Sequence, residues 1–217
     1  ISYSVTGVQT CALPIFVSSG DYSESGTALI PPAHSSPSYD NAGNLLDNGI
    51  FLFSWDAENR LQQAETSPAA TAAGIPYSRI SYTYDHQSRL VARHHHDSPN
   101  SSSPTRSTRF LHAGWRCLGA LNANNQLTRS LAWGLDSASQ LHLGDPNSSL
   151  LWIHDHLQNT RLVAHADPAG HLAGLIDSHS RQPAARYLHS PFGETLAATG
   201  PAAKSNPWRF SSHFQDP

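Results

Sequence analysis

Histidine is the residue type in this sequence most able to do chemistry, with 14 copies among 217 residues. His94, His95 and His96 are consecutive, and His154 and His156 lie two positions apart. Imidazole nitrogens are common zinc ligands, and residues two apart face the same side of a strand. These spacings raise a His-based metal enzyme as one hypothesis.

Both groups have a simpler explanation. The consecutive run opens a segment, residues 94–107, that is rich in Ser, Pro and Asn. A solvated loop lacks the rigid frame that brings three ligands together, and we expect these His residues to lie in such a loop. The sequence alone does not place an Asp or Glu beside either group. The sequence therefore predicts no metal site and no cofactor.

Other catalytic signatures are absent from the sequence. It contains no Gly-x-Ser-x-Gly nucleophile elbow, no phosphate-binding Gly-x-x-x-x-Gly-Lys loop and no Gly-x-Gly-x-x-Gly fingerprint. Asp40, Asp56 and Asp85 recur at equivalent positions, and a repeated turn residue is poor evidence for a unique acid–base pair. Cys117 is expected to be a small buried hydrophobe. We expect that the protein is not an enzyme.

Composition narrows the class of partner. Charged residues make up 13% of the chain and the net charge is −3, which argues against a nucleic-acid-binding protein because such proteins need a basic face. No apolar run approaches the ~18 residues of a transmembrane helix. Four tryptophans could stack on sugars, although at strand positions they more often pack in a core. They are Trp115, Trp133, Trp152 and Trp208.

The first fifteen residues have an unusual origin in this interpretation. Residues 5–15 read VTGVQTCALPI, the in-frame translation of a short-read sequencing adapter. We therefore expect residues 1–15 to be an artefact of gene assembly, and residues 16–36 to be a linker or an incomplete repeat. Cys11 then leaves the count, so Cys117 has no disulfide partner within the chain.

A seven-residue cassette recurs three times without gaps. Its pattern is an aromatic residue, Asp, two free positions, a turn former, Asn or Arg, and Leu. Weaker copies begin at Leu121 and Ala166. The residues that carry the three full copies are Tyr39, Asp40, Gly43, Asn44 and Leu45, then Trp55, Asp56, Arg60 and Leu61, then Tyr84, Asp85, Arg89 and Leu90.

The pattern is typical of a β-hairpin corner. Aromatic and β-branched residues alternate with other residues over 51–55 and 80–84, which predicts strands with one buried face. The Asp can accept hydrogen bonds from backbone N–H groups further along the turn. Gly43 and Asn59 can adopt a positive φ at the turn, and Ser88 fits that role less well.

These residues resemble the YD repeat of the bacterial RHS family, Tyr-Asp-x-x-Gly-Asn/Arg-Leu. Further segments resemble the RHS repeat-associated core. Residues 133–136 read W-G-L-D and resemble a W-G-x-D strand that often precedes this core. The core-like residues are His154, Asp155, His156, Leu157 and Arg161 (H-D-H-L-x-x-x-R), Pro191, Phe192, Gly193 and Glu194 (D-P-F-G-E), and Asn206, Pro207, Arg209 and Phe210 (N-P-F-R-F). The chain departs from the family at Gln158–Asn159 and His189–Ser190, which stand in place of Gly-Ser and Tyr-Asp.

The resemblance implies a mainly β fold, in which antiparallel strands and hairpins form part of a spiral β-sheet shell. It divides the chain into YD repeats with loop insertions over residues 37–110 and an incomplete core over residues 111–217. One such insertion is expected at residues 65–76. In the family the chain continues through a D-P-x-G segment, linked to autocleavage, into a variable effector. We therefore expect a fragment that is truncated at both ends.

The sequence is compatible with three functions. The resemblance favours a structural segment of an RHS-type polymorphic toxin or secreted protein, whose shell encapsulates a C-terminal effector. The expected partners are then the remainder of its own chain and the secretion machinery, and the expected location is secreted or cell-envelope. A cell-envelope protein that binds carbohydrate or another partner is the alternative. The His-based metal enzyme is the third.

Overall fold

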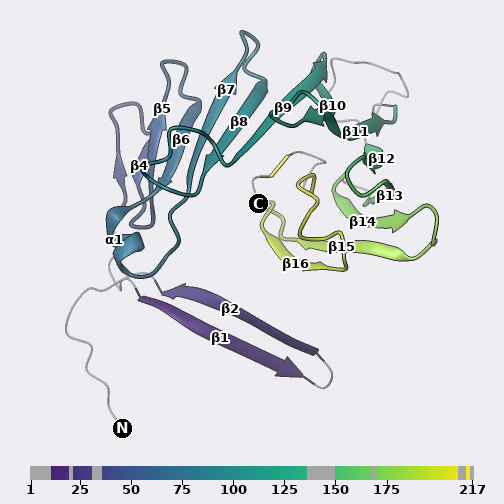
Figure 1. The fold of residues 1–217 in the computed structure, drawn as a ribbon, viewed down its shortest axis with the longest axis horizontal. Helices are drawn as coiled ribbons and strands as arrows, with labels where there is room; N and C mark the ends of the chain where they lie inside the picture. The colour runs from purple at the N-terminus through teal and green to yellow at the C-terminus, as the bar shows by residue number, and fades with distance from the viewer. Residues whose placement is uncertain are drawn as a thin grey trace. The chain divides into compact units, whose positions relative to one another are not determined.

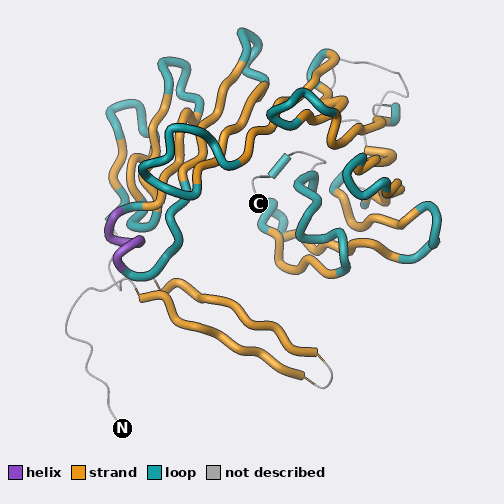
Figure 2. The backbone as a smooth tube through the Cα atoms, in the orientation of Figure 1, coloured by secondary structure: helices purple, strands orange, loops and turns teal. Residues whose placement is uncertain are grey.

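The computed structural model describes residues 11–19, 22–30, 36–135, 150–167, 170–209 and 214–215, with side chains from residue 36 onward. The fold is mainly β and antiparallel, as expected (Figures 1 and 2). The chain forms two compact units, residues 1–107 and 108–217. Among the described residues, no helix is long and apolar enough to span a membrane.

A separate two-stranded sheet comes first in unit 1. Strand β1 (Cys11–Ser19) pairs with β2 (Tyr22–Ile30) in an antiparallel register that matches Cys11 with Ile30. This hairpin crosses the boundary expected at residue 15 and places strand in residues that we expected to be a linker or an incomplete repeat. The adapter origin of residues 1–15 concerns the gene and stays a prediction.

The rest of unit 1 is an antiparallel sheet in which each strand pairs with the next along the chain. Consecutive cassettes close the β3–β4, β5–β6 and β7–β8 hairpins, so their corners lie at the same edge of the sheet (Figure 1). Strand β5 alternates between half-buried and exposed residues as its sequence predicts. The strands are β3 (Ser38–Tyr39), β4 (Leu45–Asp47), β5 (Phe51–Trp55), β6 (Leu61–Thr66), β7 (Arg79–Tyr84) and β8 (Leu90–His96).

The insertion expected as a loop at residues 65–76 contains regular structure. Strand β6 runs through Thr66, and helix α1 (Pro68–Ala72) follows it. The Ala70 N–H donates to Ser67 Oγ over 3.1 Å, so Ser67 caps the helix, and Pro68 occupies its first turn. A hydroxyl cap, a proline at the first position and an alanine-rich run all favour helix. The loop prediction was wrong because it weighed composition above these signals.

The His run is also placed differently from our expectation. His94, His95 and His96 are the last residues of β8, and the latter two are only 8% and 9% exposed. Strand β8 extends this far because it pairs with β7 up to the contact of Arg79 with His96. The solvated-loop prediction was therefore wrong for these residues.

Unit 2 continues the pattern of neighbouring antiparallel strands. Its core comprises large apolar side chains that are at most 6% exposed: Leu131, Leu150, Ile153, Leu162, Leu172, Leu175 and Trp208. The strands are β9 (Arg106–Ala113), which begins just before the unit boundary, β10 (Arg116–Leu121), β11 (Leu127–Trp133), β12 (Leu150–Asp155), β13 (Thr160–Ala166), β14 (Leu172–Asp177), β15 (Pro183–His189) and β16 (Thr195–Thr199).

Gly200 provides a test of this packing. Its φ is +104°, and a Cβ there would lie 2.6 Å from the Ala184 carbonyl oxygen. Gly170 has a φ of +85° with nothing within 4 Å of the Cβ position. Gly170→Ala should lower the free energy of unfolding by about 1–2 kcal/mol, the cost of a left-handed alanine. Gly200→Ala should add a further ~1–3 kcal/mol from the backbone collision. Equal losses in urea denaturation would contradict this packing.

Candidate functional site

The cassette corners are the most regular polar feature of unit 1. At the third corner, the Asp85 N–H donates to the Arg89 carbonyl over 3.0 Å, and the Ser88 N–H donates to the Asp85 carbonyl over 3.0 Å. The Asp85 carboxylate accepts from the N–H groups of Gln87 and Arg89, at 2.9 and 3.0 Å. One side chain therefore satisfies two turn N–H groups, which defines the corner.

The first two corners repeat these bonds. Asp40 accepts from the N–H groups of Ala42 and Asn44, and Asp56 from those of Glu58 and Arg60, all at 2.8–3.0 Å. The residue three positions after each Asp has a positive φ: +85° at Gly43, +58° at Asn59 and +61° at Ser88. Ser88, which we expected to fit less well, adopts the same conformation, so the bonds to the Asp outweigh its local preference.

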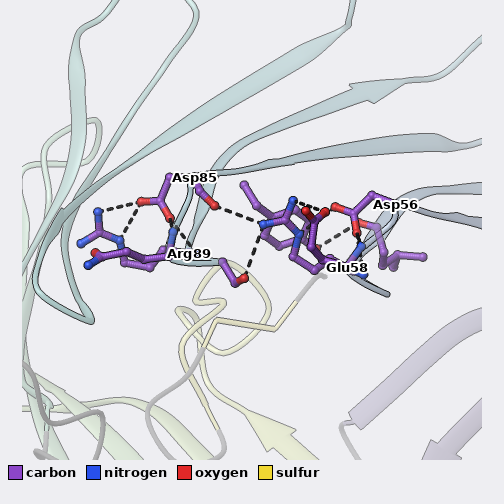
Figure 3. Close-up of polar contacts among 9 residues, drawn as sticks. Asp56, Glu58, Asp85 and Arg89 are labelled. Atoms are coloured by element: carbon purple, nitrogen blue, oxygen red, sulfur yellow. Dashed lines mark hydrogen bonds and ion pairs between the residues drawn. The ribbon is translucent and has the colours of Figure 1, made fainter.

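The Asn or Arg of each cassette binds the second carboxylate oxygen of its own Asp. Arg60 Nε lies 2.7 Å from Asp56 Oδ2, and Arg89 Nε lies 2.7 Å from Asp85 Oδ2 (Figure 3). Asn44 Nδ2 makes the equivalent bond to Asp40 Oδ2 at 2.9 Å. The shared property of this position is a side-chain N–H donor of sufficient length, which explains why both Asn and Arg occur there.

The bonds at the third corner favour the ionised carboxylate. Desolvation raises the pKa of Asp85, but the hydrogen bonds from the Arg89 side chain and backbone and from the Gln87 N–H outweigh it and lower the pKa to about 2. At Asp56 the balance has the same sign, with desolvation opposed by the bonds from Arg60. The carboxylates at these corners are therefore structural anions.

Successive cassettes are joined through the aromatic residue. Trp55 Nε1 donates to the carbonyl of Leu45 over 2.7 Å, and the Tyr84 hydroxyl donates to the carbonyl of Leu61 over 3.0 Å. Trp55 and Tyr84 thus each bind the closing Leu of the cassette before their own. This explains why the pattern pairs an aromatic hydrogen-bond donor with a Leu at fixed spacing.

Side chains at the sheet edge add a second link between corners. Asn44 Nδ2 donates to Asn59 Oδ1 over 2.8 Å. Arg60 Nη1 donates to the carbonyl of Asp85, which Figure 3 labels, over 3.1 Å. The Arg60 guanidinium also lies 5.1 Å from the centre of the Tyr84 ring, a cation–π distance. The three corners therefore form one connected row.

Unit 2 contains the same corner with other residues. Asn122 replaces Asp and accepts from the N–H groups of Asn124 and Gln126, both at 3.0 Å. Ser190 Oγ accepts from the Glu194 N–H over 3.1 Å, and the Gly193 N–H donates to the Ser190 carbonyl over 3.0 Å. The sequence missed this last corner because Ser stands in the Asp position.

The core-like residues around Ser190 lie at the surface. Phe192 is 98% exposed, and Pro191 and Glu194 are exposed as well. Gly193 has a φ of +91°, the turn conformation of the cassette.

Asp155 of the H-D-H-L segment makes a longer version of the corner. Its carboxylate accepts from the N–H groups of Leu157 and Gln158, both at 3.0 Å, and Asn159 has a φ of +50°. Asp155 is 8% exposed and also pairs with Arg129 at 3.3 Å. Its place is therefore structural, and Asn159 in place of the family's Ser is compatible with the turn.

His154 and His156 lie together on the opposite side from Asp155. Their ring centres are 4.1 Å apart, and His156 Nε2 is 2.9 Å from Ser130 Oγ. Arg161, which pairs with His154 across the strands, is exposed, and Leu157 is 75% exposed. Within the described residues, no three His, Cys, Asp or Glu side chains converge to hold a metal ion.

The N-P-W-R segment packs into the interior of unit 2. Asn206, 4% exposed, donates through Nδ2 to the Trp208 carbonyl over 2.6 Å and to the Tyr187 hydroxyl over 3.2 Å. Arg209 donates to the Ala203 carbonyl over 3.0 Å and lies 5.5 Å from the Tyr187 ring centre. Pro207 is buried, and Phe210 lies outside the described residues. The segment fills the core and satisfies its own polar groups.

The four tryptophans considered as sugar-binding residues differ in their exposure to solvent. Trp208 is 2% exposed, with the Arg129 guanidinium 5.8 Å from its ring centre, so it cannot stack on a sugar. Trp133 Nε1 donates to the Cys117 carbonyl over 2.6 Å. Trp115 and Trp152 are 50% and 39% exposed.

Burial raises the pKa of Cys117 to about 11, so its thiol is a poor nucleophile.

A cavity of about 290 Å³ lies beside the segment in unit 2. Its lining includes Arg129, Asp155, Asp177, Gln182 and Asn206. Two of the carboxylates in it already serve as corner acceptors, because Asp177 accepts from the N–H groups of His179 and Ser180 at 3.0 and 2.6 Å. The polar lining is thus largely engaged in structure.

Comparison with known proteins identifies the fold. The chain is similar to a crystal structure of TcdB2–TccC3–TEV, to the Photorhabdus luminescens Tc holotoxin pore with the TccC3 mutation D651A, and to TcdB2–TccC3–Cdc42. Identity is 15% in each case, and the TM-scores are 0.54, 0.53 and 0.53. The fold is RHS-like. The match covers 82% of this chain but 8% of each of those chains, so this chain spans a small part of its neighbours. No family model and no curated protein match it.

The link between cassettes can be tested with a matched pair of substitutions. Tyr84→Phe removes the bond to the Leu61 carbonyl and should lower the free energy of unfolding by about 0.5–1.5 kcal/mol. Tyr39→Phe is the control, because Tyr39 is 59% exposed, and its effect should be close to zero. Chemical denaturation measures both. Equal effects would show that the Tyr84 bond does not stabilise the row.

The lowered pKa of Asp85 predicts how the stability of the third corner depends on acid pH. Because the folded pKa of Asp85 is about 2 and its ordinary value is 3.8, its contribution is complete above the ordinary value. The contribution should be lost as the pH falls through about 2. Carboxyl-detected NMR should show Asp85 titrating near its lowered value, and Arg89→Met should raise that value. An ordinary titration in the wild-type protein would mean that the corner bonds are absent in solution.

Proposed function

We propose that this chain is a wall segment of an RHS-type toxin-associated β-shell, which encloses a C-terminal effector carried on the same polypeptide. The observation that carries the proposal is the row of cassette corners, in which each aromatic residue binds the Leu carbonyl of the cassette before it. Such a linkage extends without limit in one direction, as a continuous wall requires. The RHS-like fold supports the same conclusion.

In this proposal the cassette and core residues have structural duties. Asp40, Asp56 and Asp85 fix corners, and Asn206 organises the packing of the N-P-W-R segment. The effector chemistry belongs to another part of the chain. The partners are the remaining repeats, the effector and a secretion apparatus, and the protein acts outside the cytoplasm or at the cell envelope.

Exposed tryptophan supports one alternative, a cell-envelope protein that binds carbohydrate. Trp115 is 50% exposed, whereas the buried Trp208 is no longer a candidate for such contact. Glycan-array binding that Trp115→Ala abolishes and Trp133→Ala leaves unchanged would favour this alternative.

Protease protection of the intact gene product tests the shell function. The full-length protein should contain a further domain after residue 217, and trypsin should digest that domain much more slowly in the native protein than in the unfolded one. Asp56→Ala removes the acceptor of one corner and should increase the digestion rate. Trp115→Ala, at an exposed residue outside the cassettes, is the control and should not. A stop codon soon after residue 217, or an unprotected domain, would contradict the shell function.

A further inference from the structure

Three side chains in unit 1 form an arrangement that the proposed function does not use. Ser78 Oγ lies 2.9 Å from His95 Nε2, and His95 Nδ1 lies 3.0 Å from Asp97 Oδ1. Ser78 immediately precedes β7, His95 belongs to β8, and Asp97 follows the end of β8. Ile80 pairs with His95, and Ser78 and Asp97 each lie two residues from this pair, just beyond the paired ends of β7 and β8. Residues two apart in extended chain face the same side, so these side chains lie on one face.

The order of contacts is that of an activated serine nucleophile. A carboxylate that accepts from Nδ1–H leaves Nε2 free to accept the serine proton, and the imidazole then acts as a general base. His95 is 8% exposed and Asp97 side chain is 53% exposed, so the imidazole is held within the sheet while the site remains open to solvent at the carboxylate. The sequence could not reveal this arrangement, because the three residues lie in different local contexts and no Gly-x-Ser-x-Gly elbow is present.

We propose that Ser78, His95 and Asp97 form an acyl-transfer site of the Ser–His–Asp type that acts on small esters. Ser78 Oγ attacks the ester carbonyl carbon, and its proton passes to His95 Nε2. The bond from that carbon to the alcohol oxygen then breaks, and the alcohol leaves with the proton from His95. Water, deprotonated by His95, then attacks the acyl carbon; the bond from that carbon to Ser78 Oγ breaks, His95 returns the proton to Oγ, and the carboxylic acid leaves. No cofactor or oxidant is needed.

Arg106 contacts the same ring nitrogen of His95 as Asp97 and therefore influences which tautomer the imidazole adopts. Its Nη2 atom lies 3.0 Å from the same Nδ1 of His95. Guanidinium can only donate, so a bond to it requires Nδ1 to carry no hydrogen. Nε2 then carries the hydrogen and cannot accept the serine proton. Asp97 and Arg106 therefore favour opposite tautomers of His95, the first reactive and the second unreactive.

The chain supplies two internal controls. Ser107 Oγ lies 2.8 Å from His94 Nδ1, and Ser130 Oγ lies 2.9 Å from His156 Nε2. In neither pair does a described carboxylate contact the His. These serines resemble Ser78 in their contact with imidazole and differ from it in the absence of the orienting acid. They should not react.

A fluorophosphonate probe tests the proposal on the whole protein. Ser78 Oγ displaces fluoride from phosphorus, forming a P–O bond as the P–F bond breaks, and the proton passes through His95 to solvent. Peptide mass spectrometry should place the adduct on Ser78, with none on Ser107 or Ser130. Asp97→Asn should slow labelling about tenfold or more. Arg106→Met should accelerate it, and Ser78→Ala should abolish it.

The two flanking substitutions separate a nucleophile from a packing contact, because loss of structure would change labelling in the same direction for both. Circular dichroism of each variant checks the fold, and the mapping on the wild-type protein needs no variant. Absence of an adduct on Ser78, or equal labelling of Ser78 and Ser107, would overturn the proposal. Protease protection of the effector segment is a separate property, so either proposal can fail without the other.

Discussion

The bond between an Asp carboxylate and the N–H groups two and four residues later is the interaction on which the sheet depends. It satisfies two backbone N–H donors that the turn would otherwise leave without a partner inside the protein. It also holds the third residue at positive φ, whether that residue is Gly43, Asn59 or Ser88. Because the corner has a fixed length, the aromatic residue before it and the Leu after it keep a constant relation. The register of each hairpin follows from that relation.

The corner then determines how hairpins associate. The aromatic donor binds a carbonyl of the preceding hairpin, and the Asn or Arg of the cassette reaches the following corner. Stability is therefore supplied mainly between neighbours, as in other repeat proteins. Unit 2 uses the same corner at Asn122 and Ser190 but adds a different solution. There the N-P-W-R segment buries Trp208, and Asn206 and Arg209 donate to the carbonyls of Trp208 and Ala203.

The sequence allowed the regular parts of this structure to be predicted, because period-two patterns and turn formers act locally. Strand β5 over Phe51–Trp55 and the corners at Asp40, Asp56 and Asp85 fall in this group. Helix α1 could have been predicted from its Ser67 cap, Pro68 and its alanines, but the Gly and Pro residues that follow it favoured a loop. The strand position of His94–His96 and the contact of Ser78 with His95 depend on pairing between strands, which no single segment encodes. The burial of Trp208 depends on a fold of the whole unit for the same reason.

The central claim is that stacked corners of this kind build the wall of a container. Electron cryo-microscopy of the intact gene product measures this most directly. The account predicts a closed shell in which further strands flank the strands described here on both sides, with density for the C-terminal segment inside the shell. A solid sandwich of sheets, or an open sheet with the C-terminal segment in solvent, would contradict it.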